Sequence, residues 1–275
     1  MADAPRPPAT PLRIAVMGAS ASVETSYHGG PRSDLGYPRV LEAELLAAGI
    51  PATVRVVAIP ADRVRHGLAA WEEQVLPWAP DVVVVHYGQA DSVLFFLPRW
   101  MERHANSPRE RPGRLRRSYR RLVVRPIWIG LAKVQMRTDR PVDPMATSRR
   151  QRRATAELAR LLEVVRATSP ALVLVPSLVR PGPPWQRWFP GAAGRMAALN
   201  RTFAEAVARR GDPDIRTFPL AELVEERTPP DEEPTPDGGH FTPAVHRLVG
   251  AALADEILDW ERARRSGASC PPMAG

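Results

Sequence analysis

The stretch that decides the fold is Leu12-Arg13-Ile14-Ala15-Val16-Met17-Gly18-Ala19-Ser20-Ala21-Ser22. Apolar residues run directly into a turn made almost entirely of Gly, Ala and Ser. This pattern predicts a buried strand whose carboxyl end opens into a tight loop. In open α/β sheets, ligands bind at the carboxyl ends of the strands. Ser20 is therefore well placed to act on a ligand, and it is our candidate nucleophile.

A serine hydroxyl attacks a substrate at neutral pH only when a base, itself held by a third group, takes its proton. The best candidates for both lie near the other end of the chain, where Asp237 and His240 are separated by Gly238 and Gly239. We expect a flexible turn that lets the carboxylate reach one ring nitrogen and leaves the other nitrogen free for the proton of Ser20. The same Asp-x-x-His spacing is also common in plain surface turns.

Outward from the first strand, apolar runs and helical patterns alternate along the chain. Strands are predicted over 12–17, 54–59, 81–87, 171–175 and 215–220, and helices over 37–48, 62–78, 145–168, 192–210 and 243–264. We expect the proline- and tryptophan-rich stretch 183–188 to be a loop and the acidic, proline-rich stretch 221–237 to be coil. Alternation of this kind implies an α/β fold with a parallel sheet and helices on both faces.

The length of 275 residues allows one large domain, which we place at 11–264 between a disordered start (1–10) and a flexible tail (265–275). No run approaches the roughly 18 apolar residues that span a bilayer, and no signal peptide is evident, so a cytoplasmic protein is expected. The single cysteine, Cys270, excludes internal disulfides. The histidines show no metal-binding spacing, so we expect neither a metal nor a cofactor.

The positive charge is concentrated in one segment. Residues 99–153 hold 17 basic and 4 acidic side chains, whereas the rest of the chain carries a net charge of −5. We interpret residues 95–144 as an arginine-rich insertion after the third strand, with two short helices. Its aromatic residues suit either a lid or acyl pocket or ordinary core packing; they are Phe95, Phe96, Trp100 and Trp128. Its arginines suit an anionic partner or a solvated face, and no motif indicates nucleic-acid binding.

Three blocks of the sequence resemble the SGNH/GDSL hydrolases, which are esterases, lipases and acyltransferases. The Gly-Asp-Ser-Leu-Ser block appears as 18–22, the Gly-x-Asn-Asp block as 88–91, and the Asp-x-x-His block as 237–240 before the last helix. The resemblance implies a flavodoxin-like three-layer α/β/α sandwich with a five-stranded parallel sheet. It also implies that Ser20 is the nucleophile, that His240 is the base and that Asp237 orients the base.

Two departures from the family pattern affect the oxyanion hole. Ala61 stands where the family has a glycine whose N–H binds the oxyanion, so that N–H is kept and a Cβ is added. Ala90, after Gly88, stands where the family has an asparagine, and alanine has no side-chain donor. Losing one such donor typically costs about 2.7–4 kcal/mol, or 10²–10³ in rate. The N–H groups of Ser20 and Ala61 remain, Gly88 is a further candidate for the oxyanion hole, and either Gln89 or a group from the insertion is a candidate replacement for the lost donor.

These observations predict a serine esterase that cleaves a small-molecule acyl ester through an acyl-serine intermediate. A first alternative is O-acyl transfer to a sugar-like or natural-product hydroxyl, because Gly88 to Ser92 also resembles actinobacterial acyltransferase-type relatives. A second is a non-catalytic binding protein with a degraded oxyanion hole. The candidate substrate contacts are Gln89, Asp91, Trp100 and Trp185. For Asp91 we favour a role in holding its loop, and we expect His28, His86 and His246 to be structural.

Overall fold

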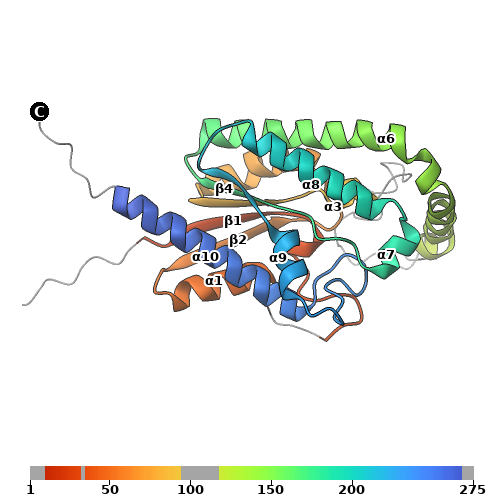
Figure 1. Cartoon of the computed structure of the whole chain (residues 1–275), viewed down its shortest axis with the longest axis horizontal. Helices are drawn as coiled ribbons and strands as arrows, with labels where there is room; N and C mark the ends of the chain where they lie inside the picture. The colour runs from red at the N-terminus through yellow and green to blue at the C-terminus, as the bar shows by residue number, and fades with distance from the viewer. Residues whose placement is uncertain (1–9, 32–34, 94–117, 268–275) are drawn as a thin grey trace, which may run out of the picture.

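A five-stranded parallel sheet forms the centre of the computed structural model, which describes residues 10–31, 35–93 and 118–267 (Figure 1). The strand order is β2-β1-β3-β4-β5. The strands are β1 (Leu12–Gly18), β2 (Ala52–Ala58), β3 (Val82–His86), β4 (Leu172–Pro176) and β5 (Ile215–Phe218). Each end of these five strands lies within two residues of its predicted position, so the expected α/β architecture is confirmed. The carboxyl end of β1 lies between β2 and β3, at the edge of the sheet where α/β folds bind ligands.

Helices cover both faces of the sheet, as the alternating sequence predicts (Figure 1). One face packs on α1 (Tyr37–Ala47), α9 (Leu220–Arg227) and α10 (Pro243–Gly267), and the other packs on α2 (Val64–Ala70), α6 (Arg125–Thr168) and α8 (Ala192–Ala208). Strand β3 serves both cores, because Val82 and Val84 face the first set of helices while Val83 and Val85 face the second. Burial on both faces explains why this strand is an unbroken apolar run.

Helix α6 corrects our interpretation of the arginine-rich insertion. A helix was expected from Met145, yet α6 begins at Arg125 and follows a turn of π-helix, η4 (Arg120–Val124). Pro141 and Pro144 misled the prediction, because proline removes a helical N–H donor and usually ends or kinks a helix. Here the helix continues past both, and Figure 1 shows it changing direction between its yellow-green start and its green main part. The rest of the insertion, residues 94–117, lies outside the described part of the chain.

Two further helices occur where loop or coil was predicted. Helix α7 (Pro183–Trp188) lies in the proline- and tryptophan-rich stretch, and its two prolines occupy the first turn, where a missing N–H costs nothing. Helix α9 lies in the acidic stretch and buries Leu220 and Val224, a four-residue spacing that indicates a helix. The helix predicted over 62–78 is divided into α2, the π-helix η2 (Trp71–Val75) and the 3₁₀-helix η3 (Leu76–Trp78).

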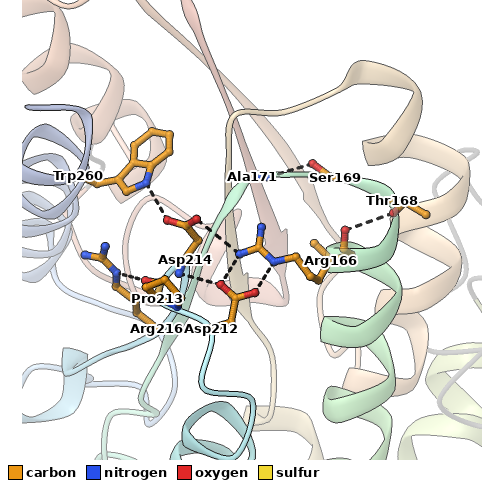
Figure 2. Close-up of polar contacts among 10 residues, drawn as sticks. Arg166, Thr168, Ser169, Ala171, Asp212, Pro213, Asp214, Arg216 and Trp260 are labelled. Atoms are coloured by element: carbon orange, nitrogen blue, oxygen red, sulfur yellow. Dashed lines mark hydrogen bonds and ion pairs between the residues drawn. The ribbon is translucent and has the colours of Figure 1, made fainter. Parts of the chain in front are cut away.

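Polar contacts join the two helical layers at the amino ends of β4 and β5 (Figure 2). Arg166 of α6 donates to Asp212 at 2.6 Å, and Trp260 of α10 donates its indole N–H to Asp214 at 3.1 Å. These aspartates precede β5, so one loop ties a helix from each face to the sheet's edge. This end of the molecule therefore serves as a fixed base, and the opposite edge is open for a site. Among the described helices, none combines the length and the apolarity needed to cross a membrane.

Candidate active site

A cavity of about 500 Å³ lies at the carboxyl edge of the sheet. Ser20 after β1, Ala61 after β2, Ala90 after β3 and His240 before α10 all contribute to its wall. The structure therefore brings together residues up to 220 positions apart, as expected for the edge at which α/β folds bind ligands. Of the sequence-predicted site residues, Gln89 and Trp185 also line this cavity.

Ser20 begins η1 (Ser20–Ser22), a single turn of 3₁₀-helix directly after β1. The first N–H groups of a helical turn have no intrahelical acceptor, so the amide of Ser20 is available to a ligand. Gly18 makes this geometry possible, because a Cβ there would lie 2.7 Å from the carbonyl oxygen of His86 and 2.6 Å from Oγ of Ser22. The glycine thus lets β1 and β3 approach closely just before the serine.

Asp237 and His240 are joined by a short hydrogen bond. Nδ1 of His240 lies 2.7 Å from Oδ2 of Asp237, which leaves Nε2 as the ring nitrogen free for the cavity. The same carboxylate accepts backbone N–H bonds from His28 at 2.8 Å, Gly239 at 3.0 Å and His240 at 2.9 Å. Partial burial raises the pKa of Asp237, but these four hydrogen bonds outweigh it and hold that pKa well below its usual range. The carboxylate therefore stays ionised and fixes the imidazole ring.

Gly238 and Gly239 also allow close packing, a role that the sequence-based interpretation of this turn did not include. A Cβ on Gly238 would lie 2.2 Å from Cδ1 of Trp185, and one on Gly239 would lie 2.4 Å from Cζ2 of the same ring. Gly238 also adopts a φ of 105°, a region that favours glycine. The Trp185 indole therefore presses on the backbone between Asp237 and His240, and the two glycines allow that contact.

Ala61 lies in a tight turn after β2. The N–H of Asp62 donates to the carbonyl of Ile59 at 3.0 Å, with Pro60 in the second position and Ala61 in the third. Ala61 has a φ of 63°, so this is the type II pattern, in which the third position usually holds glycine. The backbone conformation that a glycine would favour is thus retained by an alanine, at the cost of some strain.

The segment after β3 forms the remaining wall of the cavity. Gly88 adopts a φ of 120°, and it is followed by α3 (Gln89–Val93). Ala90 lines the cavity with a methyl group, so it supplies no side-chain donor. Gln89 also lines the cavity, and its Nε2 donates to the carbonyl of Gly239 at 2.9 Å. An amide nitrogen carries two hydrogens, so Gln89 can bridge the histidine loop and still donate a second bond.

One of the proposed substrate contacts, Asp91, does not line this cavity. Oδ2 of Asp91 instead accepts the N–H of Val64 at 3.2 Å, at the start of α2, and the side chain lies in a separate groove beside Arg63 and Arg150. Burial raises the pKa of Asp91 to about 6. This placement suits the loop-holding role that we favoured for it. Trp100 lies outside the described residues.

Sequence reasoning missed several residues of the cavity. We expected His28 to be structural, yet it lines the cavity, and its ring centroid lies 5.0 Å from that of His240. Trp188 and Phe189, at the end of α7, and Ile129 of α6 add apolar surface. The spacing of Trp185 and Trp188 is helical and could have indicated a shared face, had α7 been recognised.

The donor atoms of His28, Asp237 and His240 all lie within 4.8 Å of one another. That distance would allow a metal ion, but the 2.7 Å contact between Asp237 and His240 is the length of a charge-assisted hydrogen bond. An ionised carboxylate that orients an imidazole at a cavity also lined by a serine is suited to nucleophilic catalysis.

A buried polar network lies beneath this site. The hydroxyl of Tyr37 lies 2.8 Å from Oγ of Ser22 and 3.2 Å from Nδ1 of His86, and the backbone N–H of Tyr37 donates to Nδ1 of His246 at 3.1 Å. Burial lowers the pKa of each of these two histidines from 6.5 to about 4, so both are neutral at pH 7. The network connects η1, α1, β3 and α10, which are the elements that surround Ser20. The structural role expected for His86 and His246 agrees with these contacts.

Comparison with known proteins adds independent evidence. Residues 16–248 match the GDSL-like lipase/acylhydrolase family, whereas no curated protein matches the sequence. A lipase/acylhydrolase from Enterococcus faecalis is similar in structure, with a TM-score of 0.58, 17% identity, and coverage of 90% of this chain and 96% of that one. Axe2, an acetylxylan esterase from Geobacillus stearothermophilus, has a TM-score of 0.55 and 14% identity, and the match covers 90% of this chain and 94% of that one. An aryl esterase from M. smegmatis has a TM-score of 0.55 and 16% identity, and the match covers 90% of this chain and 99% of that one. The match covers most of the chain, and we conclude that this protein belongs to the GDSL-like lipase/acylhydrolase family and is a serine hydrolase of the esterase type.

Proposed function

We propose that Ser20, His240 and Asp237 form the catalytic triad of an ester-cleaving enzyme. Oγ of Ser20 attacks the acyl carbonyl carbon while Nε2 of His240 takes the hydroxyl proton. The tetrahedral intermediate collapses, and His240 returns the proton to the departing alcohol. Water then attacks the acyl-serine by the same route and releases the acid. The single observation that carries the proposal is the ionised Asp237 holding His240 at the cavity that Ser20 also lines.

The oxyanion would be held by the backbone N–H groups of Ser20 and Ala61. Support comes from the position of Ser20 at the start of η1 and from the glycine-like backbone of Ala61. Because Ala90 offers no donor, the third contact of the family is missing unless Gln89 supplies it. The loss of one such donor typically lowers kcat by a factor of about 10²–10³. We therefore expect an enzyme that is slow on simple esters unless Gln89 contributes.

The acyl group would occupy the apolar wall of the cavity. That wall consists of Val93, Ile129, Trp185, Trp188 and Phe189. Burying a methylene group against such a surface stabilises binding by about 0.8 kcal/mol. We expect kcat/KM to rise with acyl length from acetyl upwards until the chain fills the cavity. This expectation differs from the acetyl esters that the name of the Geobacillus esterase indicates.

Acyl transfer to a hydroxyl acceptor is the second candidate, favoured by the same apolar wall. Aromatic side chains around an acyl-serine limit the access of water, so the intermediate persists until another alcohol binds. Added polyol or sugar acceptors would then give ester product in place of free acid. If water competes successfully at every acceptor concentration, the enzyme is a hydrolase.

Labelling with a fluorophosphonate probe tests the proposed nucleophile. The wild type and Ser22→Ala are expected to label, because Ser22 is buried against Tyr37 and does not line the cavity. Ser20→Ala is expected not to label. Labelling of Ser20→Ala at the wild-type rate would contradict the proposal, and Ser22→Ala controls for loss of a neighbouring hydroxyl on the same turn.

A further inference from the structure

Exposed apolar side chains gather on one short segment. Twelve large hydrophobic residues are exposed in the described part of the chain, and seven of them lie between 119 and 136. Leu122 is 72% exposed, Val134 52% and Ile127 44%. Single exposed apolar residues are ordinary on soluble proteins, whereas a contiguous group marks an interaction surface.

The same segment is basic. Arg121, Lys133 and Arg137 are exposed, and no acidic residue occurs between positions 111 and 138. We define the basic–apolar surface as these three cations together with Leu122, Ile127, Val134 and Met136. Apolar side chains interleaved with cations suit a partner that is both apolar and anionic.

The opposite face of this segment is firmly attached to the body of the protein. Nε2 of Gln135 donates to the carbonyl of Val93 at 2.8 Å, and Asp139 forms a buried bidentate ion pair with Arg195 at 2.7 and 3.0 Å. These contacts hold the start of α6 against α3 and α8. The exposed face is therefore presented in a fixed orientation.

The basic–apolar surface adjoins the mouth of the catalytic cavity. Ile129 lines the cavity and is still 38% exposed, and Trp188 of α7 has the same two properties. Figure 1 shows the start of α6 and helix α7 at the same end of the molecule. A partner that rests on this surface would cover or border the entrance to the cavity.

We propose that the basic–apolar surface docks the protein on an anionic lipid surface. Each cation near such a membrane strengthens binding by about fivefold, and apolar side chains add to this by entering the boundary between headgroups and acyl chains. A second copy of this chain fits less well, because a two-fold interface would bring the same cations against one another. Nucleic acid would satisfy the cations but would leave Leu122 and Val134 in water. Docking would place the cavity mouth at a source of acyl chains, a consequence that rests on the proposed esterase function.

Co-sedimentation with lipid vesicles tests the inference without any measurement of activity. The full chain is expected to sediment with vesicles of phosphatidylcholine and phosphatidylglycerol, and much less with phosphatidylcholine alone. Raising the salt concentration should weaken binding, because it screens the cations. Since Ser20 takes no part in docking, Ser20→Ala should bind as the wild type does. Failure of esterase activity would thus leave this inference intact, and failure of binding would leave the esterase intact.

Two sets of variants identify the surface. The triple change Arg121→Glu, Lys133→Glu and Arg137→Glu should reduce partitioning by at least roughly a hundredfold. The pair Leu122→Glu and Val134→Glu should also abolish binding. Leu46→Glu on α1, at a residue 65% exposed on the opposite layer, and Arg209→Glu at the end of α8 are matched controls that should bind normally. Circular dichroism melting curves verify that each variant is folded.

Three results would overturn the inference. The first is wild-type protein that stays in the supernatant with anionic vesicles. The second is unchanged binding by both sets of variants. The third is a wild-type dimer in sedimentation equilibrium that the Leu122→Glu and Val134→Glu pair dissociates, because the surface would then belong to a second copy of the chain.

Discussion

At the residue scale, the proposed site combines an aspartate-held histidine with a serine that lines the same cavity. Asp237 accepts four hydrogen bonds, so the orientation of His240 is strongly determined. In the oxyanion hole that we propose, Ala61 and Ala90 take the positions of the family's glycine and asparagine. The alanine at 61 keeps its N–H in a strained backbone, whereas the alanine at 90 loses a donor. We interpret the site as one that retains its nucleophile and has fewer oxyanion donors.

The strain at Ala61 can be tested by substitution. Ala61→Gly should raise the free energy of unfolding by about 0.5–1 kcal/mol, because glycine adopts a positive φ without the clash of a Cβ. Urea denaturation gives the value. Ala79→Gly is a matched control, since Ala79 has a φ of 49° but lies outside the cavity, in the turn after η3. Both variants should be stabilised. Destabilisation by Ala61→Gly alone would show that the alanine methyl group makes a contact that outweighs the strain.

At the scale of elements, the start of α6 is held by the ion pair of Asp139 and Arg195. The side chains of this pair are 0% and 3% exposed, and Asp139 also accepts the N–H of Gly191 at 2.7 Å. Nε of Arg195 donates to the carbonyl of Ser92. One buried pair thus connects α6, α3 and the start of α8, and the first two of these helices contribute Ile129 and Val93 to the apolar side of the cavity.

Breaking that pair should be costly. Asp139→Asn leaves the guanidinium of Arg195 buried without its counter-charge, and we expect a loss of about 3–5 kcal/mol in urea denaturation. Asp259→Asn is the matched control, because its partner Arg262 is exposed and such surface pairs contribute about 1 kcal/mol or less. Hydrogen exchange should show faster opening of the first turns of α6 in Asp139→Asn. Equal stability of the two variants would mean that the buried pair does not hold α6 in place.

The buried network around Tyr37 predicts how stability depends on pH. His86 and His246 have pKa values of about 4 in the folded protein and 6.5 when unfolded. The unfolded chain therefore binds more protons between these values, so the free energy of unfolding should fall as the pH drops from 6.5 to 4 and then level off with respect to these groups. Burial raises the pKa of Asp91 from 3.8 to about 6, so this group makes the free energy of unfolding rise as the pH drops. The two histidines together outweigh this single group.

Urea denaturation at a series of pH values measures this dependence. His86→Gln should reduce the slope of the free energy of unfolding against pH between pH 4 and 6.5, and Asp91→Asn should increase that slope. A slope that is unchanged in His86→Gln would show that His86 does not titrate as its burial implies. The slope is the quantity to compare, because each substitution also changes stability at neutral pH.

Much of the fold could be predicted from sequence because its strongest signals are local. The unbroken valine run of β3 and the turn after Gly18 indicate buried strands and an open edge without any tertiary information. Helices α7 and α9 were missed because each is one or two turns long, which is too short for a clear periodic pattern. The start of α6 was missed because Pro141 and Pro144 indicate a break, while the contacts that hold it there are long-range.

The candidate site could be predicted only in part for a similar reason. Ser20, Asp237 and His240 occur in recognisable blocks, so it could be anticipated that Ser20 and His240 line one cavity and that Asp237 bonds to His240. The position of His28 depends on a backbone hydrogen bond to Asp237, 209 residues away, and nothing in its local sequence indicates that contact. The packing of Trp185 on Gly238 and Gly239 likewise requires the folded loop.

At the scale of the whole molecule, the two ends of the sheet have different roles. The amino ends of β4 and β5 are tied to both helical layers through Arg166, Asp212 and Trp260 (Figure 2). The carboxyl ends of β1, β2 and β3 lead into the wall of the cavity, to which α6 and α7 add apolar side chains. This polarity places a rigid base beneath a site whose walls come from six separate parts of the chain.

Intact-mass spectrometry during a single turnover with p-nitrophenyl octanoate tests the central claim most directly. We predict that the mass of the wild-type protein increases by one octanoyl group. One equivalent of nitrophenol should be released as this adduct forms. The adduct should be absent from Ser20→Ala and should form far more slowly in His240→Ala, because that variant lacks the base. The lifetime of the adduct in water then distinguishes a hydrolase from a transferase. An octanoyl adduct on Ser20→Ala, or nitrophenol release by the wild type with no adduct at any time, would contradict an acyl-serine mechanism at Ser20.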